Sequence, residues 1–160
     1  MTDANAKSRL IDVQLDQGSV GRRSAEIEHE RAIAIYDLLE DNHFEPVGCA
    51  EGPYRLHLSL EENRLIFDIR DESDESLGRV PLPMMPFRRI IKEYFQICES
   101  YYDAIKHAPP SRIEAIDMGR RGLHNDGSEL LRERLEGKIE LDHNTSRRLF
   151  TLLCVLHIRK

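Results

Sequence analysis

Two runs of alternating apolar and polar residues, separated by a short polar segment, constrain the fold of this 160-residue chain more than any other feature. Apolar residues recur at every second position in residues 54–60, and again in residues 64–70 after Glu61-Glu62-Asn63. Because successive side chains of a strand point to opposite faces, this pattern predicts a β-hairpin with one buried and one solvated face. His57 and its neighbouring arginines fall on the solvated face, where we expect cross-strand charge pairs.

Weaker strand and helix signals surround the hairpin. We expect further strands at residues 9–16, 43–47 and 77–82. Apolar residues at helical spacing in residues 27–39 predict one early amphipathic helix, with Ser24 as its cap. The prolines at positions 81, 83 and 86 predict a rigid linker, because each fixes φ and lacks an amide donor.

The rest of the chain is predicted to be helical. Apolar spacing covers residues 87–105 and 145–158, and the second segment is apolar nearly all round, as a buried helix is. Between them, Ser111 is a candidate cap after two prolines. Asn125-Asp126-Gly127 is a turn signal, and Asp126 with Glu129 matches a capping box, so we favour a helix break near Asn125. Against this break, positions 113, 116, 120, 123, 127, 130 and 134 continue one stripe at helical spacing, which favours one unbroken helix.

Strands therefore gather in the first half of the chain and helices in the second, an order that indicates the α+β class. We expect an N-terminal, mostly antiparallel sheet with one early helix, followed by a C-terminal group of three or four helices. The length fits a single domain over residues 9–160, with residues 1–8 as a flexible tail.

Charge is unevenly distributed. The formal net charge is −6; residues 1–110 hold 13 basic and 21 acidic residues, whereas residues 111–160 hold 10 basic and 8 acidic residues. An acidic chain binds a phosphate backbone poorly, so no nucleic-acid partner is expected. The mildly basic C-terminal third can still contain a local anion site.

The cysteines and the apolar runs bear on location. Cys49, Cys98 and Cys154 are odd in number and widely spaced, which does not describe a disulfide framework. Two of them stand among apolar residues and are expected to be buried thiols. The longest apolar run, residues 149–158, is about half of what a membrane-spanning helix needs, and no secretory signal is visible. We expect a cytoplasmic protein with no membrane partner.

The densest group of chemically useful side chains lies in residues 120–128. The candidate ligand-binding residues are Arg120, Arg121, Asn125 and Ser128, and the candidate catalytic residues are His124 and Asp126. Guanidinium groups bind planar anions through paired hydrogen bonds, and an imidazole that titrates near neutral pH can act as acid or base. The alternative is an ordinary turn between helices, with the arginines paired to acids such as Asp117.

Several stretches together resemble a known family. They are residues 28–32, 52–64 (GPYRLHLSLEENR), 86–92, 99–102, 116–125 (IDMGRRGLHN) and 127–135. In this order they resemble uncharacterised protein family 0262, a set of short alphaproteobacterial proteins. The resemblance implies a soluble bacterial protein, and it assigns neither an activity nor site residues.

Two classes of function follow. The sequence contains no Cys-x-x-Cys pair, no His-x-x-x-His pair, no phosphate-loop signature and no Gly-x-Ser-x-Gly elbow, so we expect no metal and no cofactor. The first hypothesis is a non-enzymatic regulatory or protein-interaction domain, with a homodimer or a protein partner. The alternative is an enzyme or sensor that binds a small anionic ligand around residues 120–126.

Overall fold

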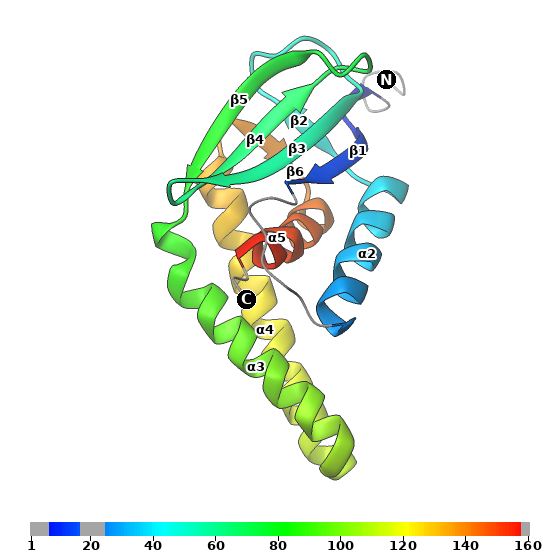
Figure 1. Ribbon diagram of the computed structural model, residues 1–160, viewed down its shortest axis with the longest axis vertical. Coiled ribbons are helices and arrows are strands. Elements are labelled where there is room, and N and C mark those ends of the chain that lie inside the picture. The colour runs from blue at the N-terminus through cyan, green and yellow to red at the C-terminus, as the bar shows by residue number, and fades with distance from the viewer. Residues whose placement is uncertain (1–6, 17–24, 158–160) are drawn as a thin grey trace.

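The computed structural model describes residues 7–16 and 25–157 (Figure 1). The predicted cap at Ser24 and most of the predicted tail lie outside the described residues. The elements are β1 (Leu10–Leu15), α2 (Ala25–Glu40), β2 (Phe44–Pro46), β3 (Tyr54–Glu61), β4 (Arg64–Arg70), β5 (Ser76–Pro83), the 3-10 turn η2 (Met85–Phe87), α3 (Arg88–His107), α4 (Pro110–Leu135), β6 (Ile139–Leu141) and α5 (His143–His157). The early helix and the later group of three helices confirm the predicted α+β class.

The four-stranded sheet has the order β1-β3-β4-β5 and is built on the predicted hairpin. Glu61 pairs with Arg64, so the turn contains only Glu62 and Asn63. Both turn residues have positive φ, 50° and 66°, the left-handed geometry that matches a two-residue turn to the twist of its strands. β5 extends the sheet antiparallel to β4, whereas β1 lies parallel to β3. That parallel pair is possible because α2 carries the chain back between the two strands.

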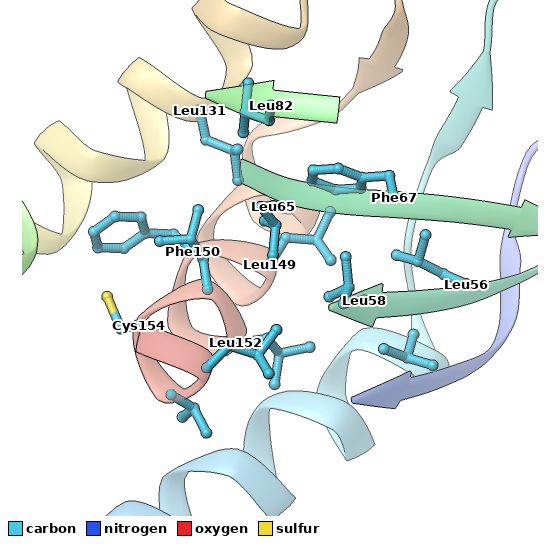
Figure 2. Close-up of a cluster of buried hydrophobic side chains, with 14 of the residues drawn as sticks. Leu56, Leu58, Leu65, Phe67, Leu82, Leu131, Leu149, Phe150, Leu152 and Cys154 are labelled. Carbon is cyan, nitrogen blue, oxygen red and sulfur yellow. The ribbon is translucent and has the colours of Figure 1, made fainter. Parts of the chain in front are cut away.

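One face of the sheet packs against α5, which is the buried helix that its apolar sequence predicted (Figure 2). Side chains from β3, β4 and α5 fill the space between them, among them Leu56, Leu58, Leu65, Phe67, Leu149, Phe150 and Leu152. All of these are at most 1% exposed. Apolar burial of this extent is the main favourable term in folding.

The opposite face of the sheet carries the predicted charge pairs. The nitrogen-to-oxygen distances are 3.3 Å for Arg55–Asp12, 2.8 Å for Arg70–Asp68, 2.9 Å for Arg79–Glu61 and 3.1 Å for His57–Asp74. Each of these basic side chains thus already has an acidic group beside it. His57, Arg55 and Arg70 thus have acidic partners, as this interpretation expects, whereas Arg64 on the same face makes no ion pair with another residue of the described ranges.

The predicted helix break near Asn125 is wrong, because α4 is one continuous helix from Pro110 to Leu135. Asp126 and Glu129 therefore lie inside the helix and form no capping box. Tertiary packing explains the glycine that suggested a turn: a Cβ atom at Gly127 would lie 2.1 Å from Cζ of Phe150. Gly127 lets α4 approach α5, and the stripe at helical spacing over residues 113–134 was the correct signal.

Two smaller predictions also need correction, and one strand was missed. Pro109 is the N-cap of α4, with no side-chain cap bond, so Ser111 is not the cap; Pro110 at the first helical position needs no amide partner. Pro81 and Pro83 belong to β5, an edge strand, where prolines are tolerated, and not to a linker. The short strand β6, which pairs with β2, was not predicted.

α3 and α4 form an antiparallel hairpin that extends away from the sheet (Figure 1). Their close approach depends on Gly119, where a Cβ atom would lie 2.8 Å from the Cδ1 atom of Ile97. α2 and α5 lie beside the half of the hairpin nearer the sheet. No helix in residues 7–16 and 25–157 is long and apolar enough to cross a membrane.

Candidate functional site: an arginine cleft between four helices

The candidate residues of α4 line a cleft of about 490 Å³ that we call the arginine cleft. α2, α3, α4 and α5 all contribute to it. Its charged and polar lining residues are Glu30, Asp37, Tyr94, Arg120, Arg121, His124, Asn144, Arg147, Arg148 and Thr151. Four of these are arginines and two are carboxylates, so this part of the surface is basic although the whole chain carries −6.

Helical spacing explains how two helices supply the basic wall. In α4, Arg120 and His124 are four residues apart and share one face, with Arg121 beside them. α5 repeats the same pattern, with Arg147 and Thr151 four residues apart and Arg148 adjacent. His124 Nε2 lies 2.7 Å from Thr151 Oγ1, and this hydrogen bond joins the two helices at the cleft.

Arg120 is held rigidly within the protein. Its Nε and Nη2 atoms donate to Asp117 Oδ1 at 3.2 and 2.7 Å, and its guanidinium lies over the Tyr101 ring, 4.4 Å from the centroid. Burial acts to lower the pKa of Arg120, but the hydrogen bond to Asp117 and the nearby acidic groups outweigh it and raise the pKa. Arg120 is therefore a fixed positive charge in the wall.

The other three arginines retain donors for a ligand. Arg121 Nε is 3.2 Å from Asp117 Oδ2, and the side chain is 61% exposed. Arg147 Nη1 donates to Asn125 Oδ1 at 2.8 Å. Arg148 Nη1 donates to the Asn144 carbonyl at 3.3 Å. A guanidinium has five N–H donors, so each of these side chains keeps several N–H groups after these bonds are made.

The acidic wall belongs mainly to α2. Glu30 accepts a hydrogen bond from the Tyr102 hydroxyl of α3, and Asp37 Oδ2 lies 4.0 Å from Arg148 Nε. These contacts anchor α2 to the helices opposite, so the two carboxylates contribute to the shape of the cleft as well as to its charge.

His124 forms part of the floor and is not a free imidazole. Its ring packs between Tyr94 and Phe150, with centroid distances of 5.4 and 5.3 Å. Its Nδ1 atom is buried and has no hydrogen-bond partner within the described part of the chain. Burial, together with the positive charges of Arg147 and Arg120, lowers the pKa of His124 to about 4. The imidazole is therefore neutral near pH 7 and cannot serve there as an acid.

The structure separates the remaining predicted residues from the cleft. Asp126 lines a different hollow, beside Glu129 and Glu133. Ser128 is fully buried and donates to the His124 carbonyl at 2.8 Å, as a residue internal to α4. Asn125 is exposed and acts on the cleft only through its bond to Arg147. Of the six predicted residues, the cleft is lined by Arg120, Arg121 and His124.

Comparison with known proteins gives a consistent family. A model of the uncharacterised protein family UPF0262 matches residues 7–159. The chain belongs to the UPF0262 family. A UPF0262 protein of Paramagnetospirillum magneticum is 61% identical over 96% of this chain and 98% of its own. A UPF0262 protein of Rhodospirillum rubrum is 63% identical over 94% of this chain and 92% of its own. A UPF0262 protein of Brucella anthropi is 59% identical over 99% of this chain and 99% of its own. No solved structure matches.

Sequence reasoning on this UPF0262 chain missed Arg147 and Arg148. The signal was present: an Arg-Arg pair followed three residues later by a hydroxyl residue mirrors the Arg-Arg pair that is followed by His124. What the pattern lacked was any sign that the two helices face each other. Within the described residues, no cluster of three or more His, Cys, Asp or Glu side chains is placed to hold a metal ion.

Proposed function

We propose that this UPF0262 protein is a non-enzymatic sensor or regulatory protein that binds a small anionic molecule in the arginine cleft. The observation that carries the proposal is the meeting of four arginines from two helices in one cleft of an acidic chain. The volume, about 490 Å³, falls in the range of small-molecule sites. Carboxylates and phosphates are the groups that guanidinium forks bind best.

The placement of the donors supports binding of one anion between the helices. Arg120 is held in place by its 2.7 Å contact with Asp117, so it is a fixed part of the wall and need not move when the anion binds. Arg121 from α4 and Arg147 from α5 flank the cleft with free N–H groups and can approach the same anion. An anion held in this way bridges α4 and α5, so its binding adds to the stability of the folded protein.

The position of His124 and Asp126 supports binding over catalysis. The two predicted catalytic groups face different hollows, and the buried imidazole is neutral at working pH. Without an acid–base pair in contact with the ligand, recognition is the function that this cleft can perform. The buried thiols of Cys98 and Cys154 are free, and this supports a reducing, cytoplasmic location.

A homodimer or a protein partner stays a prediction. Large exposed apolar residues of the described chain lie on separate elements, namely Ile33 and Tyr36 on α2, Val47 after β2, Met85 in η2, Ile105 on α3 and Met118 on α4. Scattered residues of this kind are ordinary on a protein surface. They indicate no single interface, so the anion cleft has the stronger support.

The test is a thermal-shift and calorimetric titration of the full chain with inorganic phosphate, phosphorylated metabolites and dicarboxylates at low salt. A ligand at about 100 times its Kd should add about 2.7 kcal/mol of stability, or about 5–10 °C in Tm for a chain of this size. Arg147→Ala should remove the shift. Arg134→Ala removes the same charge from the exposed far end of α4 and should leave the shift intact.

Two results would contradict the proposal. One is a panel in which no anion raises Tm in the wild type. The other is a ligand that stabilises the wild type, Arg147→Ala and Arg134→Ala equally, because such binding would not use the arginine cleft.

A further inference from the structure

A second, larger hollow lies at the opposite end of α3 from the hairpin tip, and it has a chemistry of its own. Its volume is about 1230 Å³, and we call it the basic groove. It is lined by the end of β3, the hairpin turn, the start of β4, the end of β5, η2, the first three turns of α3 and His157 at the end of α5. None of the residues of the arginine cleft takes part.

The floor of the basic groove is apolar. Met84 and Ile91 are 1% and 3% exposed, and Leu60 and Phe95 pack partly buried against the same core. Met85, at the rim, is 70% exposed. A floor of this composition offers dispersion contacts and desolvation to an alkyl chain, but nothing to a small inorganic ion.

The rim near the start of α3 is cationic. Arg64, Arg88 and Lys92 line it, all three are exposed, and none makes an ion pair with another residue of the described ranges 7–16 and 25–157. Arg89 also lines the groove but is paired with Glu93 at 3.2 Å. The carboxylates of the groove are Glu62, in the hairpin turn, and Glu99. Residues 88 and 99 are about 16 Å apart along α3, so Glu99 lies at the other end.

The position of these cations is unfavourable in the free protein. The first turn of α3 contains two arginines and no acidic residue, and its N-cap makes no side-chain bond. Positive side chains at a helix N-terminus oppose the helix dipole. An anionic group bound at this end would therefore interact favourably with the helix dipole and balance the unpaired positive charges of the rim.

We propose that the basic groove binds a free anionic amphiphile, an alkyl carboxylate or alkyl phosphate. The head group is held by Arg64, Arg88 and Lys92. The alkyl chain of the amphiphile lies over Leu60, Met84, Ile91 and Phe95. Exposed cations alone hold a simple anion weakly, because water and salt screen them. The apolar floor supplies the affinity and the cations supply the selectivity for charge.

The experiment titrates the full chain by calorimetry with octanoate, decanoate, dodecanoate and decyl phosphate, each below its critical micelle concentration. Affinity should rise roughly two- to fourfold per added methylene. Decyltrimethylammonium and inorganic phosphate should bind at least tenfold more weakly than decyl phosphate. The variant Arg88→Gln/Lys92→Gln should lose at least fivefold in affinity for decanoate. Lys106→Gln, at the far end of the same helix, should not change it.

A second variant tests the contact with the alkyl chain of the ligand without disturbing the protein core. Met85→Gln alters only an exposed rim residue and should lower the affinity for dodecanoate more than that for octanoate. Arg147→Ala, in the arginine cleft, should change neither, so this proposal and the proposed function fail independently.

Three results would overturn the inference. They are equal binding of the cationic and anionic amphiphiles, affinity that does not depend on chain length, and binding only to vesicles that contain anionic lipid. The last result would assign the groove to a membrane surface in place of a free molecule.

Discussion

Replacing Gly127 with alanine tests the packing of α4 against α5 directly. Gly127 lies in the interior of α4, and a Cβ atom there would meet three atoms of the Phe150 ring, at 2.1, 2.4 and 2.6 Å. Phe150 is fully buried, with Tyr94 and His124 against its ring. The ring cannot move aside without displacing both neighbours.

Two opposing terms decide the magnitude. Alanine is favoured over glycine in a helix interior by about 1 kcal/mol. Overpacking a filled core costs typically about 1–3 kcal/mol, and a contact this short on an immobile ring belongs at the upper end. We expect Gly127→Ala to lower the free energy of unfolding by about 1–2 kcal/mol net, or about 2–8 °C in Tm.

Gly122→Ala is the matched control, because it makes the same change five residues earlier in the same helix. Apart from the adjacent residues and the backbone of the same helix turn, no atom would lie within 4 Å of a Cβ atom at Gly122. Only the propensity term applies, so this variant should gain about 0.5–1 kcal/mol. Urea denaturation followed by circular dichroism measures both.

Equal stabilisation by the two alanines would refute the reasoning, since it would mean that α4 does not press on Phe150. A further check is the double variant Gly127→Ala/Phe150→Leu. Its cost should be smaller than the sum of the single costs, because the smaller side chain makes room for the methyl group.

Three further predictions concern other sites. The pKa of the His124 imidazole falls from 6.5 to about 4 on folding, so the unfolded chain is protonated at a higher pH than the folded protein. Lowering the pH from 6.5 to 4 should therefore remove about 3 kcal/mol of stability. His124→Gln should flatten that part of the plot of urea midpoint against pH. Asn42 makes three hydrogen bonds to the backbone of β1 and α2, so Asn42→Ala should lower the free energy of unfolding by about 2–3 kcal/mol. The control is Asp41→Ala at the exposed neighbouring residue, which should change the free energy of unfolding by no more than about 0.5 kcal/mol. Native thiol titration should modify Cys49 first, because the other two cysteines are buried and burial raises the pKa of Cys98 to about 11; equal rates at all three would contradict the packing of α3 and α5.

The strands were predictable where local pattern and burial agree. Residues 54–60 alternate because one face of β3 lies on α5 and the other faces water, so the sequence itself records the two environments. β6 leaves no such record, since three residues are too few to establish a period, and its pairing with β2 joins segments about a hundred residues apart.

Gly127 shows how a local signal can mislead. Asn125-Asp126-Gly127 is ordinary turn chemistry, and this signal was preferred over the stripe at helical spacing in residues 113–134, which indicated one unbroken helix. The ring of Phe150, contributed by another helix, is what requires a glycine there. The prediction failed because the reason for the residue lies 23 positions away in the sequence.

The candidate site was also predictable only in part. The local sequence by itself grouped Arg120, Arg121 and His124 in one short stretch, and composition determined that the C-terminal third is basic. Only the tertiary structure decided that Arg147 and Arg148 join them, that Asp126 faces another hollow, and that His124 is buried and neutral. Spacing along one helix is set by backbone geometry, which local sequence encodes. The facing of two helices, and the burial that shifts a pKa, depend on contacts between distant segments, which arise only when the whole chain packs.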